Sequence, residues 1–122
     1  MAAVIVLTSV PDVKSARRLS RLLVNERLAA CVTSLPGATS VYRWKGRLES
    51  ARETLLWIKT ARSRIKGLQK SFKEHHPYDL PEFLVLPVSG GSRGYLSWLE
   101  EGVDLSGLEP LASSLRTRGS TN

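Results

Sequence analysis

The sequence predicts an α+β domain in which four strands and two helices follow one another in the order β-α-β-β-α-β, with a short helix at the end. Two observations support this fold class. Short apolar runs rich in β-branched residues alternate with longer segments in which apolar residues recur at helical spacing. Two of the strand-like runs also flank Lys45-Gly46, a pair typical of a tight hairpin turn. With 122 residues, 42% of them hydrophobic, the chain has the length and composition of one globular domain.

The first strand and helix are predicted from the beginning of the chain. Residues 3–10 form a short apolar run that ends before Pro11 and are typical of a buried strand. A helix is expected over residues 11–27, with Ser9 or Asp12 as its N-cap. Its inward face should be formed by apolar residues at helical spacing, namely Val13, Ala16, Leu19, Leu22 and Leu23.

A long hairpin follows the first helix. Its expected strand segments are residues 28–32, 39–44, 47–49 and 53–60. Pro36-Gly37 interrupts the first arm and indicates a bulge or kink rather than a chain end. Each arm is expected to exceed the usual strand of about five or six residues. Because such a ribbon leaves unpaired strand edges that a protein must cover, we expect the chain to associate with copies of itself.

The last elements complete the predicted order. A second helix is expected over residues 61–75, with Ile65, Leu68 and Phe72 facing inward, and a strand over residues 82–88. Ser92 can cap a short helix whose apolar residues are Tyr95, Leu96, Trp98 and Leu99. Two helices on one face of a four-stranded antiparallel sheet form the ferredoxin-like arrangement.

The domain is expected to end near Gly102. Residues 1–102 form the predicted domain, and residues 103–122 form a C-terminal extension that is partly ordered or frayed. The spacing of its leucines indicates one more docked segment, and these residues are Leu105, Leu108, Leu111 and Leu115.

The formal charge of +7 raises the question of an acidic partner. Basic residues recur at helical spacing on both helices and form two stripes, Lys14, Arg17, Arg18 and Arg21 on the first and Arg62, Lys66, Lys70 and Lys73 on the second. Neither stripe is interleaved with aromatic residues or lies in a nucleic-acid-binding signature. The solvated outer faces of two amphipathic helices account for both stripes, so nucleic-acid binding is not favoured.

The number of cysteines and the hydropathy of the sequence predict the cellular compartment of the protein. Cys31 is the only cysteine, which excludes an intramolecular disulfide framework and agrees with a reducing compartment. It is interpreted as a small core residue, because no neighbouring histidine or second cysteine would activate it. The apolar run at residues 4–7 is too short to span a bilayer and lacks the features of a signal peptide. We therefore expect a cytoplasmic protein with no membrane partner.

Residues 74–82 hold both histidines of the chain and are the candidate functional stretch. Pro77 should end the second helix, because it disfavours a helical conformation at His76. Imidazole is the commonest metal ligand in proteins, so His76, and after it His75, is the expected ligand of a divalent cation. Adjacent residues of an extended chain point to opposite sides, and the two rings need not share one ion. The alternative is that His75 ends the helix and His76 forms local hydrogen bonds.

Several stretches together resemble the CutA-type divalent-cation tolerance family. They are residues 26–32, 36–46, 56–60, 75–82, 86–88 and 95–99. The resemblance extends from about Val4 to Glu100, and the occurrence of these blocks in one order is specific. Residues after Gly102 are not covered by it.

The resemblance implies a small cytoplasmic homotrimer with a ferredoxin-like fold, in which the long hairpin pairs between subunits. The family is linked to tolerance of copper and other divalent cations, and no established reaction defines it. Copper binding in bacterial relatives is attributed to two histidines, matching His75 and His76, and to a cysteine whose position falls on Thr8. A hydroxyl is a poor ligand for soft Cu(I), whereas a histidine-only site favours Cu(II), Ni(II) or Zn(II).

A second function is suggested by another resemblance. The chain also resembles the PII-type trimers, whose clefts between subunits would bind an anionic ligand or nucleotide. Cationic candidates for such contacts are Lys59, Arg43 and Lys45, and the further candidates are Tyr78, Glu82 and Trp44. In the simpler interpretation Lys59 ends a strand, and Tyr42, Trp44 and Trp57 serve hairpin packing and interface contacts.

An enzyme is the third possibility. His76 with Tyr78, Asp79 and Glu82 would supply acid–base groups, but no nucleophile is paired with a base at a diagnostic spacing. We therefore expect neither catalysis nor an organic cofactor.

Overall fold

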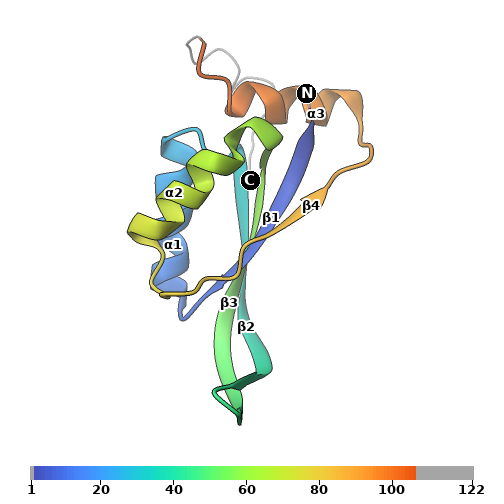
Figure 1. The fold of residues 1–122 in the computed structure, drawn as a ribbon. Helices are drawn as coiled ribbons and strands as arrows, with labels where there is room; N and C mark the ends of the chain where they lie inside the picture. Colours follow the sequence, from blue (N-terminus) through green and yellow to red (C-terminus); the bar gives the residue numbers. More distant parts are fainter. Residues whose placement is uncertain (1, 107–122) are drawn as a thin grey trace.

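The computed structural model describes residues 2–106, which form a four-stranded antiparallel sheet with two helices packed on one face and a third at one end (Figure 1). The order of the strands across the sheet is β2-β3-β1-β4. In chain order the elements are β1 (Ala3–Val10), α1 (Val13–Asn25), β2 (Cys31–Trp44), β3 (Arg47–Ala61), α2 (Ile65–His75), β4 (Leu84–Pro87) and α3 (Arg93–Gly102). This is the predicted order, and the ferredoxin-like fold class is confirmed.

The core lies between the sheet and the two helices α1 and α2. Alternate residues of β1 and β3 point toward the helices, so that one side of each strand belongs to the core. The largest fully buried side chains of this layer are Val4, Val6, Val10, Leu19, Leu23, Leu56, Ile58 and Leu68. The inward face predicted for α1 was wrong at Val13, which is 47% exposed. At 100° per residue, Ser15, Leu19 and Leu23 fall on one side of the helix, which faces the core, and Val13 falls outside that side. Ser15 is therefore buried in place of Val13.

Several predicted boundaries shift by a few residues. The strand expected over residues 28–32 begins only at Cys31, and the strand expected over residues 82–88 is limited to β4. The second helix opens with a single 3₁₀ turn, Arg62–Arg64. Both expected caps are confirmed: the backbone N–H of Ser15 donates to Asp12 Oδ1 at 2.7 Å, and that of Tyr95 donates to Ser92 Oγ at 3.3 Å.

The hairpin extends well past the rest of the sheet (Figure 1). β1 pairs with β3 only as far as Val10↔Thr54, whereas β2 and β3 stay paired to Trp44↔Arg47 beside the turn. The predicted bulge at Pro36-Gly37 is confirmed as a register shift between Leu35 and Ala38. Residues 38–53 therefore form a two-stranded ribbon that neither β1 nor a helix covers. The turn has positive φ at Lys45 (52°) and Gly46 (78°), as in a type I′ hairpin.

The third helix contacts β3 and β1, and its C-terminal end lies against the loop between α1 and β2. Leu99 and Val103 are buried, and Arg27 Nη1 donates to the carbonyl oxygens of Glu101 and Gly102 at 3.5 Å. Leu105 is 61% exposed, and Leu108, Leu111 and Leu115 lie outside the described residues. Within residues 2–106, no helix combines the length and apolar composition needed to cross a bilayer.

We predict that Gly102→Ala destabilises the protein, whereas Gly94→Ala in the same helix does not. A Cβ at Gly102 would lie 2.9 Å from Ala30 Cβ and 3.2 Å from its backbone Cα, while a Cβ at Gly94 would meet nothing within 4 Å. Gly102→Ala should cost about 1–3 kcal/mol of unfolding free energy through this overlap. Gly94→Ala should be neutral or stabilise by up to about 1 kcal/mol. Urea denaturation at one fixed protein concentration measures both, and equal effects would contradict the close approach at Gly102.

Candidate functional site

His76 is the residue at which α2 ends and the loop to β4 begins. Its backbone is extended, with φ −73° and ψ 136°, as expected before Pro77. Its side chain folds back into the protein and is only 8% exposed. The ring packs between Phe72 and Tyr78, with centroid distances of 5.2 and 5.4 Å. His76 is thus a buried residue at the edge of the core rather than a displayed one.

Both ring nitrogens of His76 have hydrogen-bond partners. Nδ1 accepts from the backbone N–H of Tyr78 at 3.1 Å, so the neutral ring carries its proton on Nε2. Nε2 lies 3.0 Å from Thr8 Oγ1 and donates to it in this tautomer. Burial lowers the pKa of His76, although the Ser9 backbone and the charge of Glu53 act in the opposite direction. The ring is therefore neutral at neutral pH.

Glu53 lies beside this histidine, at the point where β3 leaves the sheet. Its Oε2 accepts from Tyr78 Oη at 2.7 Å and from Ser9 Oγ at 3.2 Å. Burial alone would raise the pKa of Glu53, but the hydrogen bonds from Tyr78, Ser40 and Ser9 outweigh it and lower the pKa below its ordinary value of 4.5. Burial and the adjacent Glu53 carboxylate raise the pKa of Tyr78 in turn. Tyr78 is a neutral donor to an ionised acceptor.

Thr8, Ser9, Glu53, His76 and Tyr78 together form a polar cluster. Its side-chain hydrogen bonds connect the end of β1, the ribbon and the loop after α2. The residues that these bonds join are separated by 25, 44 and 68 positions in the sequence. Glu53, which accepts two of these bonds, was not among the site residues predicted from the sequence. The only local sign is a carboxylate at the start of the strand segment predicted over residues 53–60, which does not identify its partners.

The other predicted site residues do not join the polar cluster. His75 is exposed, and its Nε2 lies 3.7 Å from Glu74 Oε1. Glu82 is also exposed. Among residues 2–106, no three or more His, Cys, Asp or Glu side chains come together in a way that would hold a metal ion. The predicted role of His75 and His76 as metal ligands stays a prediction.

Trp44 and Lys59 lie at opposite ends of the hairpin. Trp44 is 49% exposed and pairs with Arg47 beside the turn. Lys59 pairs with Cys31 and donates from Nζ to Thr33 Oγ1 at 3.4 Å. Arg47 and Lys59 are twelve residues apart in β3, about 40 Å in an extended strand. One small ligand cannot contact both residues within a single chain.

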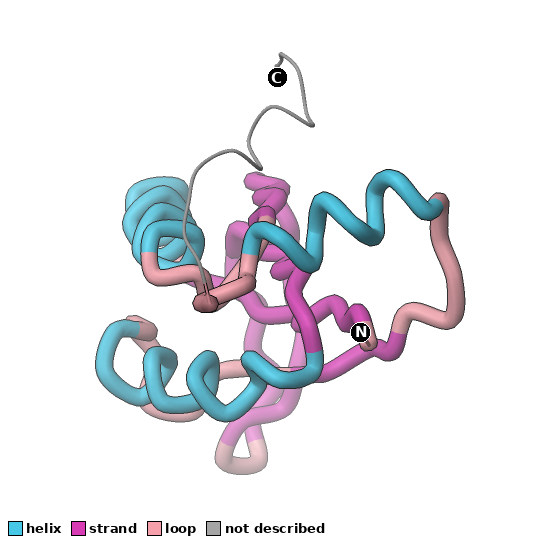
Figure 2. Tube along the Cα trace, turned by 90° about the horizontal axis from the view of Figure 1, so that it is seen from above, coloured by secondary structure: helices cyan, strands magenta, loops and turns pink. Residues whose placement is uncertain are grey.

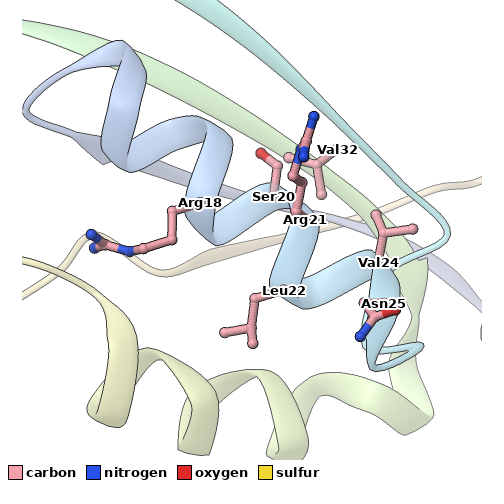
Figure 3. Close-up of a pocket in the computed structure, with 7 residues that line it drawn as sticks. All are labelled: Arg18, Ser20, Arg21, Leu22, Val24, Asn25 and Val32. Carbon is pink, nitrogen blue, oxygen red and sulfur yellow. The ribbon is translucent and has the colours of Figure 1, made fainter.

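A surface cavity of about 750 Å³ lies elsewhere, along α1 (Figure 3). Its lining residues are Arg18, Ser20, Arg21, Leu22, Val24, Asn25 and Val32. It includes no member of the polar cluster and none of the site residues predicted from the sequence. The cavity therefore does not account for the histidine-containing stretch.

Comparison with known proteins decides the family. A model of the family described as CutA1 divalent ion tolerance protein matches residues 4–102. The chain belongs to this family. A divalent-cation tolerance protein CutA of Pectobacterium atrosepticum is 52% identical over 97 residues, covering 80% of this chain and 88% of the relative. One of Yersinia pestis is 50% identical over 97 residues, covering 80% and 82% respectively.

Solved structures of the family have the same fold. CutA1 from Oryza sativa superposes with a TM-score of 0.84 at 39% identity, covering 87% of this chain and 97% of that one. The protein from Thermus thermophilus gives a TM-score of 0.81 at 43% identity, covering 84% and 99%. The resemblance found in the sequence is confirmed. The family is one of divalent-cation tolerance proteins and not a known enzyme family.

We predict that His76 makes stability fall as the pH is lowered from 7 toward 5. The pKa of His76 in the folded protein lies below its ordinary value of 6.5. The unfolded chain therefore takes up the proton first, and stability is lost as the pH falls below about 6.5 toward the folded pKa. His76→Gln should flatten this dependence, by at most about 1.4 kcal/mol per pH unit for one proton.

Urea denaturation at several pH values and one protein concentration measures the effect. His75→Gln is the control, because it removes the neighbouring exposed imidazole and leaves the buried His76 ring in place. A His76→Gln variant with the same pH dependence as the wild type would show that the buried ring does not resist protonation.

Proposed function

We propose that this chain forms a homotrimer that binds divalent transition-metal ions near its paired histidines and so contributes to divalent-cation tolerance. Family membership supports the class of ion. The structural observation that carries the assembly is the apolar surface on the side of the sheet that α1 and α2 leave uncovered. We place the protein in the cytoplasm, for which the single free cysteine is the support.

The helix-free face is defined by apolar residues that alternate with the core residues along the strands. They are Ile5, Leu7, Leu35, Leu55, Trp57, Leu84 and Leu86. Within one chain Trp57 is 43% exposed, Leu84 54% and Leu86 44%. Leu7 pairs with both Trp57 and Leu84, so these side chains form one continuous patch across three strands. Patches of this kind on a protein surface mark interfaces, which favours contact with another copy.

The sheet edges support a closed ring of copies. The two edge strands, β2 and β4, are different in length and sequence. Pairing of one edge with the other edge of a neighbouring copy is a head-to-tail contact, and such contacts form rings when the rotation closes. The free ribbon of residues 38–53 supplies further backbone for this pairing. The number of copies, three, is the one implied by the family resemblance.

The two histidines differ in how readily their rings can bind a divalent cation. The His75 ring is exposed and has the Glu74 carboxylate beside it, and imidazole with carboxylate suits Cu(II), Ni(II) or Zn(II). Ligation by His76 Nε2 would require loss of the proton that it donates to Thr8. We therefore propose His75 as the first ligand and His76 as the second, the reverse of the order expected from the sequence. Thr8 offers no soft sulfur, which favours Cu(II) over Cu(I) as the copper ion bound.

We predict that the wild-type protein has about three times the mass of the 13.5 kDa chain in solution and that Trp57→Glu dissociates it. A carboxylate at this position would place a charge in the centre of the helix-free face, where it could not be solvated in the assembly. Light scattering after gel filtration at micromolar concentration measures the mass. Leu80→Glu is the control, since Leu80 is 74% exposed and lies outside the helix-free face. A wild-type mass of one chain would contradict the assembly.

We predict that His75→Ala weakens binding of Cu(II) or Zn(II) by about tenfold or more, and by more than His76→Ala does. The physical reason is that the exposed ring loses no hydrogen bond when it binds a metal, whereas His76 must give up its contact with Thr8. Titration calorimetry on variants whose assembly has been confirmed measures the affinities. Equal binding by the wild type and by the double variant His75→Ala/His76→Ala would remove the histidines from the site.

A further inference from the structure

The net positive charge of the chain is concentrated in one layer of the fold. We define the helix layer as α1 together with residues 62–75, which comprise the 3₁₀ turn and α2. Its basic residues are Lys14, Arg17, Arg18, Arg21, Arg62, Arg64, Lys66, Lys70 and Lys73, and Glu74 is its only acidic residue. The helix layer thus carries a net charge of +8, while the whole chain carries +7. All other residues together carry −1.

The fold joins two basic stripes that the sequence leaves apart. α1 and α2 contact each other and lie on the same side of the sheet (Figures 1 and 2). Eight of the nine basic residues are exposed, and only Arg64 is half-buried, with Nε donating to the Arg27 carbonyl oxygen at 3.3 Å. Within residues 2–106 none of the nine has a carboxylate within ion-pairing distance, since the one ion pair joins His75 and Glu74. Among the described residues these cations therefore form no ion pair, and Asp12 at the start of α1 is the carboxylate that acts on Arg18 and Lys14 from a distance.

The composition of the helix layer favours a hydrophilic polyanion as its ligand. Among the large apolar side chains of α1 and α2, only Val13 and Val24 are exposed, and no aromatic residue is. The helix layer therefore lacks the apolar anchors needed for insertion into a membrane or for tight contact with a protein partner. It also lacks rings on which unpaired bases would stack. It does offer guanidinium groups, which bind phosphate through two parallel hydrogen bonds.

We propose that the helix layer binds the phosphate backbone of double-stranded nucleic acid without sequence preference. Rows of cations on two adjacent helices match a polyanion with regularly spaced charges, and contacts to phosphates position a protein without reading bases. Arg18 and Arg21 also border the cavity along α1, so the basic surface continues into a depression (Figure 3). The helix layer lies opposite the helix-free face. Association through the helix-free face therefore leaves the helix layer accessible. His75, the proposed first metal ligand, lies at the end of this layer, but none of the nine basic residues that carry the proposal is a proposed metal ligand.

Fluorescence anisotropy with a labelled duplex of about 24 base pairs of arbitrary sequence tests the proposal on the full chain. Binding is expected at about 50 mM salt and should weaken by about 100-fold at about 200 mM if roughly four phosphates are contacted. A single strand of the same length should bind more weakly, because no aromatic platform holds its bases.

A matched pair of variants distinguishes an effect of where the positive charge lies from an effect of the total charge. The test variant is Arg17→Gln/Arg21→Gln/Lys66→Gln/Lys70→Gln, and the control is Lys45→Gln/Arg47→Gln/Arg52→Gln/Arg93→Gln. All eight positions are exposed in a single chain, and each variant lowers the formal charge from +7 by four. Lys45, Arg47 and Arg52 lie in the ribbon of residues 38–53, so the control is compared only once it has been shown to keep the wild-type mass. The test variant should lose at least about tenfold in affinity and much of the salt dependence, while the control should lose less than about threefold.

Circular dichroism and light scattering establish that both variants keep the fold and assembly. An equal loss in the two variants would overturn the proposal, because it would show a response to total charge alone. Absence of duplex binding at about 50 mM salt would also overturn it. Binding to vesicles containing anionic phosphatidylserine without binding to the duplex would assign the surface to a membrane instead.

Discussion

The structure depends on the fact that α1 and α2 cover only one face of the sheet. Because side chains alternate along a strand, the residues that complete the core on β1 and β3 are separated by residues that point to the uncovered side. Most of those residues are apolar, and Leu7 and Trp57, which pair across β1 and β3, are the clearest examples. A single chain therefore contains one complete core and one half of a second apolar layer. In the proposed assembly another copy covers this half, and the long hairpin supplies further surface for the same contact.

The polar cluster matters because it lies where the ribbon leaves the body of the protein. Glu53 is ionised and partly buried, so it needs the hydroxyl groups of Ser9 and Tyr78 to replace lost water. Tyr78 in turn is placed by the hydrogen bond from its backbone N–H to His76. These contacts connect the loop after α2 with the base of the ribbon. The histidine that the sequence offers as a metal ligand is therefore first of all a structural residue.

The parts of the fold that the sequence predicts well are those determined by neighbouring residues. The hairpin turn at Lys45-Gly46, the bulge at Pro36-Gly37 and the cap at Asp12 each follow from local backbone preferences. The end of α2 follows from Pro77. Glu53 and Thr8 could not be recognised in the same way, because their partners are 25 to 68 residues away and depend on how β1, β3 and the loop meet. The helix layer shows the same limit, since its two stripes become one surface only when α1 and α2 lie side by side.

Hydrogen exchange of the ribbon amides tests the central claim most directly, because in a single chain residues 38–53 have neither a third strand nor a helix over them. Measured by mass spectrometry on the wild type at micromolar concentration, peptides from this segment should exchange as slowly as peptides from β1. Ribbon amides that exchange as fast as those of the exposed residues 89–92 would contradict the account, because they would show that no second copy covers the ribbon.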